Sequence, residues 1–122
     1  MLVDVRTLAE WTFVGVPDLS VLGRDAVFVE WQDWPGMSLN TRFVEDLQEA
    51  LGERDVSVML FLCRSGVRSM AAAEAVSRAC ALEGRDVDCI NISTGFEGDL
   101  NAEKQRGGKA GWKVEGLPWR QP

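Results

Sequence analysis

Short apolar segments alternate with amphipathic ones along the chain, and this alternation restricts the possible folds more than any other feature. The apolar segments span residues 2–5, 26–29, 56–62 and 87–92. The third is the most apolar and suits a central strand covered on both faces. Strands that alternate with helices pair in parallel, with the helices packed on the sheet. The sequence therefore predicts a three-layer α/β/α fold with a mainly parallel sheet of four to five strands.

Three helices are predicted from the signals at their ends. Thr7 and Glu10 have the spacing of a capping box, which indicates a helix start at that point. Asn40 is expected to cap an amphipathic helix that stops at Gly52. An alanine-rich segment, residues 69–83, is typical of a third helix.

Length and charge limit the organisation of the chain and its partners. With 122 residues and neither an internal repeat nor a linker, residues 1–122 are expected to form a single domain. The formal net charge of −6 argues against nucleic acid as a partner, because phosphate binding needs clustered Lys and Arg. No apolar run approaches the roughly 20 residues of a membrane span, so no membrane partner is expected.

The start of the chain and its cysteines predict a cytoplasmic location. Met1 leads directly into Leu-Val-Asp, without the basic stretch and apolar core of a signal peptide. Cys63, Cys80 and Cys89 form neither a Cys-x-x-Cys pair nor an even disulfide framework. A reduced protein is therefore expected.

The complete absence of histidine excludes several kinds of chemistry. There can be no Ser-His-Asp or Cys-His catalytic pair, no His-ligated metal and no imidazole acting as a general base. A nucleophile in this chain has to be activated by its surroundings instead.

Residues 60–69, Leu-Phe-Leu-Cys-Arg-Ser-Gly-Val-Arg-Ser, carry the strongest functional signal, because an apolar strand ends and a helix starts within them. Cys63 is predicted at the carboxyl end of a parallel strand, where open α/β sheets bind ligands. The positive end of the helix dipole, Arg64 and Arg68 favour a thiolate there at neutral pH without a base. Gly66 permits the turn in which backbone N–H groups converge on an anion.

A plainer interpretation is a buried cysteine at a strand end, with Gly66 as a turn residue. The coincidence of Cys63 with Gly66, two arginines and a helix start favours function. Cys80 and Cys89 fit structural roles, and their spacing does not support either as a resolving partner of Cys63. Three charged residues are expected to form a structural ion-pair set: Asp4, Arg6 and Glu10.

Three motifs resemble those of rhodanese-like sulfurtransferase domains. Residues 63–68, Cys-Arg-Ser-Gly-Val-Arg, resemble the active-site loop of that family. Residues 2–6, Leu-Val-Asp-Val-Arg, with Glu10 and Trp11 behind them, resemble its strand signature. Residues 112–118, Trp-Lys-Val-Glu-Gly-Leu-Pro, resemble its closing motif. With the order of the elements, the resemblance covers nearly the whole chain.

The resemblance implies a sulfurtransferase. Cys63 would take a sulfane sulfur from thiosulfate or a similar small anionic donor and become a persulfide. A thiophilic acceptor would then remove the sulfur: cyanide in an assay, and a thiol, that of a protein included, in the cell. By the same resemblance, no metal or organic cofactor is needed. The loop that binds the substrate would consist of Arg64, Ser65, Gly66, Val67 and Arg68.

Three departures from the family pattern carry expectations of their own. Residues 14–19 lack the His and the second Gly of a Gly-His-Ile-Pro-Gly-Ala stretch, so this loop is expected to pack differently. Residues 97–111 form an insertion that would be a solvated loop, a lid or a partner surface. The family usually has a helix and a short strand before residues 2–6, so a reading frame that starts upstream or a trimmed fold is expected.

Two other classes of function stay open. Protein phosphatases and arsenate reductases carry a related anion loop with five residues between Cys and Arg, whereas here Arg68 comes one residue early and Ser69 follows it. The shorter loop makes a smaller bowl, which favours sulfur over a phosphoryl group. The other alternative is a non-catalytic persulfide carrier or regulatory binding module. Trp31 and Trp34 would give such a module a docking patch, although packing in the core or at a rim is the ordinary role of Trp.

Overall fold

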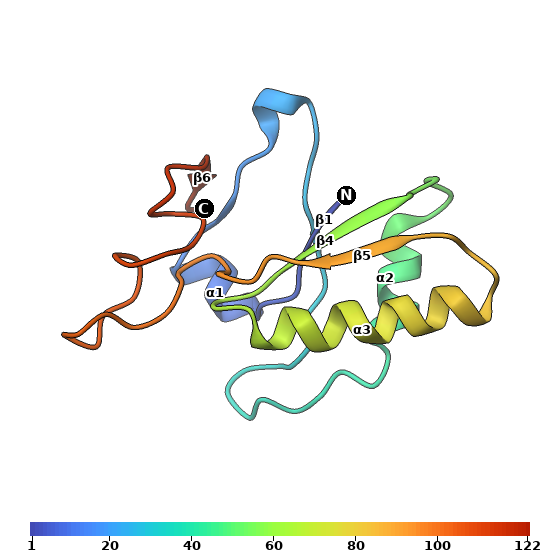
Figure 1. Ribbon diagram of the computed structural model, residues 1–122, viewed down its shortest axis with the longest axis horizontal. Coiled ribbons are helices and arrows are strands. Elements are labelled where there is room, and N and C mark those ends of the chain that lie inside the picture. Colours follow the sequence, from blue (N-terminus) through green and yellow to red (C-terminus); the bar gives the residue numbers. More distant parts are fainter.

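Four parallel strands in the order β3-β1-β4-β5 form the sheet of the computed structural model, which describes residues 1–122 (Figure 1). The strands are β1 (Leu2–Asp4), β3 (Val27–Phe28), β4 (Val58–Leu62) and β5 (Asp88–Asn91). β1 lies between β3 and β4, and β4 pairs with β5 on its other side. The predicted mainly parallel α/β sheet is confirmed, and each strand is shorter than the apolar segment that contains it.

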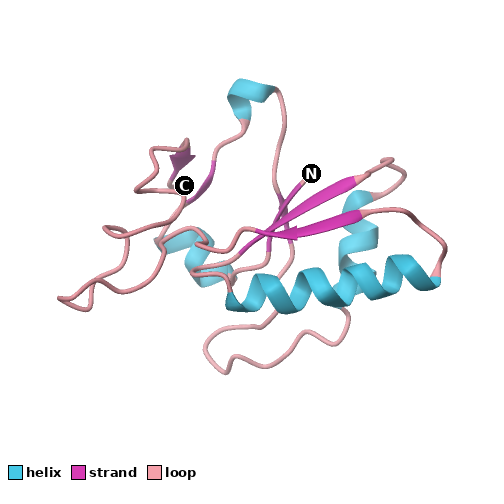
Figure 2. Cartoon of the chain, in the orientation of Figure 1, coloured by secondary structure: helices cyan, strands magenta, loops and turns pink.

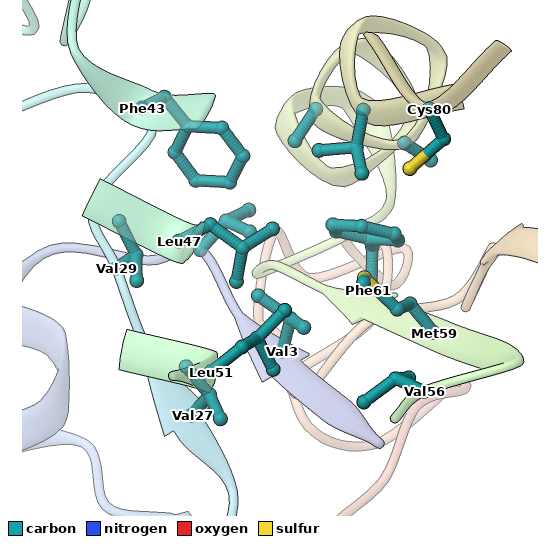
Figure 3. Close-up of a cluster of buried hydrophobic side chains, with 14 of the residues drawn as sticks. Val3, Val27, Val29, Phe43, Leu47, Leu51, Val56, Met59, Phe61 and Cys80 are labelled. Atoms are coloured by element: carbon teal, nitrogen blue, oxygen red, sulfur yellow. The ribbon is translucent and has the colours of Figure 1, made fainter. Parts of the chain in front are cut away.

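Two helices, α2 (Phe43–Leu51) and α3 (Val67–Leu82), contribute to the larger hydrophobic core on one face of the sheet. Figure 3 shows Met59 and Phe61 of β4 close to the side chains of α2 and α3 in this core. Phe43 of α2 is buried there as well. Side chains alternate between the two faces of a strand, so Leu60 and Leu62 face the other side of the sheet.

Shorter elements and loops cover that second face. α1 (Leu8–Phe13) places Trp11 edge-on against Phe28 of β3, with the ring centroids 5.3 Å apart. The chain around η1 (Ser20–Leu22) and the segment after β5 complete this layer, in which Phe96 is fully buried. The sheet thus lies between two layers, in agreement with a three-layer α/β/α arrangement.

The C-terminal segment contains little regular structure. Figure 2 shows it as loop from the end of β5 to β6 (Trp119–Arg120). β6 pairs in antiparallel fashion with β2 (Val16–Pro17) and forms a second, two-stranded sheet. This small sheet was not predicted from the sequence, because strands of two residues carry no recognisable period.

The helix ends show where the sequence signals were right and wrong. The capping box of α1 is confirmed, since Thr7 Oγ1 accepts a hydrogen bond from the Glu10 N–H at 3.2 Å. The prediction that Asn40 caps α2 is wrong, because the helix begins only after Arg42. The Asn40 side-chain oxygen instead accepts a hydrogen bond from the Arg42 N–H at 3.0 Å in the turn before the helix. Gly52 ends α2, as predicted.

The longest helix, α3, has 16 residues and begins two residues earlier than predicted, at Val67. Gly66 caps it with a left-handed backbone conformation, φ 106°. No helix of the structure is both long and apolar enough to cross a membrane.

A buried ion pair connects β1 to two other segments. Asp4 and Arg6 are fully buried, and Arg6 Nη2 lies 2.7 Å from Asp4 Oδ2. The same nitrogen donates a hydrogen bond to the Gly15 carbonyl oxygen at 2.8 Å. The guanidinium carbon lies 4.2 Å from the ring centroid of Phe96. Arg6 therefore holds the end of α1 and the C-terminal segment against the carboxyl end of β1.

Replacing Asp4 with Asn is expected to lower the free energy of unfolding by about 3–5 kcal/mol, because the buried Arg6 charge loses its partner. Chemical denaturation monitored by tryptophan fluorescence measures this loss. The control is Arg42→Gln, which breaks exposed pairs with Asp46 and Glu49 and should cost about 1 kcal/mol at most. Equal losses in the two variants would contradict the role given to burial.

Candidate functional site

Cys63 lies at the carboxyl edge of the sheet, directly after β4 and between the ends of β1 and β5. The residue is only 1% exposed. The chain turns at residues 63–66 and enters α3 at Val67. The predicted position of Cys63 at a strand–helix junction is confirmed.

Two donor groups of the junction lie within hydrogen-bond distance of the Cys63 sulfur. The Gly66 N–H donates to Sγ at 3.0 Å, and the Ser69 hydroxyl lies 3.1 Å from the same atom. Both residues belong to the start of α3, where the helix dipole is positive. The sulfur therefore faces a backbone donor, a hydroxyl and the positive end of a helix dipole.

Gly66 is required at this turn for two independent reasons. Its φ of +106° is a conformation that residues with a Cβ rarely adopt. A Cβ built at Gly66 would also lie 2.2 Å from the Ser93 carbonyl oxygen. The backbone of the loop and that of the chain after β5 are therefore packed directly on each other.

The chain after β5 clamps the Cys63 loop through backbone hydrogen bonds. The Phe96 N–H donates to the Cys63 carbonyl oxygen at 2.8 Å, and the Glu97 N–H donates to that of Arg64 at 3.0 Å. Gly95 makes this approach possible, because a Cβ there would lie 2.4 Å from the Arg64 oxygen. These contacts hold the loop in one conformation.

Arg68 is held by Glu10, from the start of α1. The two guanidinium nitrogens Nη1 and Nη2 donate to the two carboxylate oxygens at 2.7 and 2.9 Å. Glu10 therefore pairs with Arg68 and not with Arg6, and the predicted ion-pair set is wrong in this member. A carboxylate with both oxygens occupied by one guanidinium fixes the orientation of Arg68.

Both members of this pair have shifted pKa values. Burial opposes the charge of Glu10, but the hydrogen bonds and charge of Arg68, helped by Thr7, hold the pKa of the carboxyl below its ordinary 4.5. Burial also opposes the charge of Arg68, yet Glu10, Cys63 and Asp4 together raise the pKa of the guanidinium.

The other residues of the predicted loop lie at its outer surface. The Arg64 side chain is exposed and makes no hydrogen bond or ion pair within the chain, so its cation is free for a ligand. Val67 is 79% exposed and Ser65 is half-buried. The structure thus places the five predicted loop residues beside Cys63, with Arg64 as the free cation and Arg68 as the paired one.

Two residues of the site were missed by the sequence analysis. Ser69 is fully buried and reaches both Cys63 and Asn91, whose side chain stands at the end of β5. A hydroxyl one turn into the helix, facing back toward its N-terminus, was a usable signal for Ser69. For Asn91 the only signal was its place at the end of the strand beside β4.

The remaining candidate residues lie outside this cluster. Cys80 is buried in α3, and burial, with Cys80 and Asp88 nearby, raises the pKa of Cys89 to about 11. Cys89 is thus a protonated thiol at neutral pH and a weak nucleophile. Trp31 packs edge-on against Phe43, with the ring centroids 5.1 Å apart, and Trp34 is 64% exposed.

The inserted residues 97–111 begin at the Cys63 loop. The Gly98 N–H donates to the Arg64 carbonyl oxygen at 3.1 Å. Arg106 Nη1 in turn donates to the Gly98 carbonyl oxygen at 2.9 Å and closes the base of the insertion. The tip of the insertion is exposed. The insertion therefore extends the rim of the site rather than standing apart from it.

Comparison with known proteins relates nearly the whole chain to bacterial proteins, although no family model matches it. The crystal structure of Rv0390 from M. tuberculosis superposes with a TM-score of 0.82 and 46% identity, over 100% of this chain and 84% of that one. The uncharacterized proteins RC0915 of Rickettsia conorii and RP600 of Rickettsia prowazekii are each 37% identical over 119 residues, 98% of this chain and 81% of theirs. The chain belongs to the family of these proteins. None of their names states an activity.

Replacing Gly66 with Ala is expected to cost about 4 kcal/mol or more of unfolding free energy, because strain and a backbone clash coincide. Gly107→Ala is the matched control. Gly107 also has a positive φ, +84°, but a Cβ there meets nothing within 4 Å, so about 1–2 kcal/mol is expected. Urea denaturation of both variants separates the two effects. Equal losses of unfolding free energy in the two variants would show that the close approach to Ser93 does not exclude a Cβ at position 66.

The lowered pKa of Glu10 predicts a pH-dependent stability. Because the folded state favours the carboxylate, the contribution of Glu10 is fully present above its ordinary pKa of 4.5 and is lost as the pH falls through the lower value in the folded protein. The difference in unfolding free energy between the wild type and Glu10→Gln should therefore shrink in acid. Denaturation curves from pH 7 to pH 3 measure it.

The same comparison in an Arg68→Met background is the control for this effect. Without the guanidinium, the substitution Glu10→Gln should lose this pH dependence or reverse it, because the hydrogen bonds that lower the pKa are gone and burial, which raises it, remains. A pH dependence that persists unchanged in this background would contradict the assignment to Arg68.

Proposed function

We propose that the protein is a rhodanese-like sulfurtransferase that moves a sulfane sulfur from thiosulfate or a similar donor to a thiophilic acceptor through a persulfide at Cys63. The observation that supports this most is the sulfur of Cys63 at the N-terminus of α3, with Gly66 and Ser69 as hydrogen-bond donors. In a chain without histidine, this arrangement supplies an activated nucleophile without a base.

In the first step, the Cys63 thiolate attacks the outer sulfur of thiosulfate. A bond forms between Sγ and that sulfur, the sulfur–sulfur bond of the donor breaks, and sulfite leaves with the electron pair. The enzyme then carries a persulfide with its negative charge on the outer sulfur. The total charge is conserved, because the thiolate and the thiosulfate dianion give a persulfide anion and the sulfite dianion.

In the second step, the acceptor attacks the outer sulfur. Cyanide gives thiocyanate, and a thiolate gives a new persulfide. The bond between Sγ and the outer sulfur breaks, and its electron pair returns to Cys63 as a thiolate. No oxidant, metal or organic cofactor enters either step.

The loop residues would have different roles in the transfer. The backbone N–H groups of residues 64–68 would hold the anionic outer sulfur, a preorganised electrostatic stabilisation. Arg64, the free cation at the rim, would bind the sulfonate of the donor. Arg68, held by Glu10, would contribute a fixed positive charge to the pocket. A small anionic donor and a thiol acceptor in a reducing cytoplasm fit these roles.

Mass spectrometry of the intact, reduced protein after incubation with thiosulfate tests the proposal. The wild type should gain the mass of one sulfur atom, and cyanide should remove it. Cys63→Ser should gain none, whereas Cys89→Ser, the control for a weakly nucleophilic cysteine, should behave as the wild type does.

Other outcomes point to other functions. Loading with one sulfur but without catalytic turnover to any thiol would favour a persulfide carrier. No loading from thiosulfate or 3-mercaptopyruvate would contradict the proposal, and hydrolysis of an aryl phosphate would then be measured for the phosphatase alternative.

A further inference from the structure

We propose that Ser69 is a second catalytic residue of the Cys63 site, that Asn91 positions its hydroxyl, and that this pair acts mainly in the release of sulfur to the acceptor. The inference rests on the proposed sulfur transfer and assigns a step of it to residues that the loop motif does not contain.

The two residues form a continuous chain of contacts with the sulfur. Ser69 Oγ lies 3.1 Å from Cys63 Sγ and 2.5 Å from Asn91 Oδ1. Asn91 Nδ2 donates to the Gly66 carbonyl oxygen at 3.1 Å, which orients the amide with its oxygen toward Ser69. Ser69 is fully buried, so water does not compete for its hydroxyl.

A serine hydroxyl has one proton, and here two acceptors lie within reach of it. When Cys63 is a thiol, its S–H can donate to Ser69 Oγ while the hydroxyl donates to Asn91. When Cys63 is a thiolate, the hydroxyl can turn to Sγ. The direction of the Ser69 hydrogen bond therefore follows the charge on the sulfur. In the sulfur transfer itself, which begins and ends with a thiolate, the hydroxyl keeps its proton and only changes its acceptor.

The two steps of the transfer place opposite demands on this hydrogen bond. During loading, the charge leaves Sγ, so a donor at Sγ stabilises the starting state. During release, the bond from Sγ to the outer sulfur breaks and charge returns to Sγ, so the same donor stabilises the transition state and the leaving thiolate. Only an interaction that strengthens toward the transition state accelerates a step.

The expected effect of Ser69→Ala is therefore specific to one step. Release of sulfur to cyanide should slow by about tenfold, the size expected for one hydrogen bond to a charged group. Loading from thiosulfate should change by less than about threefold, because a less stabilised thiolate is scarcer but more nucleophilic.

Single-turnover measurements separate the two steps. Quenched-flow mass spectrometry follows the gain of one sulfur from thiosulfate and then, after removal of the donor, its loss to cyanide. Full loading of Ser69→Ala shows that its site is intact. Ser69→Thr, which retains a hydroxyl, should release sulfur within about threefold of the wild type. Ser77→Ala, at an exposed position of α3, is the matched control and should change neither rate.

Each result has one meaning. Slow release with near-normal loading in Ser69→Ala, restored in Ser69→Thr, supports the inference. If the wild type loads normally, two results for Ser69→Ala overturn the role of Ser69: unchanged release, or loading and release slowed equally. Both leave the proposed sulfur transfer unaffected. A wild type that takes up no sulfur contradicts the proposed function itself.

Discussion

The Gly66 N–H and the Ser69 hydroxyl meet at the sulfur of Cys63, 3.0 and 3.1 Å from it, and the surrounding structure holds these three groups in place. The geometry depends on a strand that ends where a helix starts, with a glycine of positive φ between them. A parallel sheet supplies this junction at its carboxyl edge, where helix N-termini face the ends of the strands. The placement of Cys63 against two hydrogen-bond donors is thus a consequence of the topology combined with one permissive residue.

The contacts around the junction come from segments far apart in the chain. Glu10 reaches Arg68 across 58 residues, and Asn91 reaches back to Gly66 across 25. The buried pair of Asp4 and Arg6 fixes the end of β1, the strand next to β4. Each of these residues is buried or partly buried and has at least one partner, although Arg6 Nη1 is buried without a hydrogen-bond partner. Such networks are costly to disrupt.

Much of the fold could be predicted because its signals are local. The apolar segments contain the four strands of the parallel sheet, and the spacing of Thr7 and Glu10 gave the start of α1. Cys63 with its loop could be placed at the strand–helix junction for the same reason. The pairing of Glu10 with Arg68 and the contact of Ser69 with Asn91 depend on tertiary positions, which a single sequence does not contain. Asn40 shows the limit of local signals, because its side chain accepts a hydrogen bond in a turn before α2 instead of capping the helix.

The account depends on Cys63 as the atom that carries the transferred sulfur. A crystal structure of the protein after treatment with thiosulfate tests this most directly. It should show one additional sulfur atom bonded to Cys63 Sγ, within hydrogen-bond distance of the backbone N–H groups of residues 64–68. An unmodified Cys63 in crystals of protein that has gained the mass of one sulfur would contradict the account, since the sulfur would then be on Cys80 or Cys89.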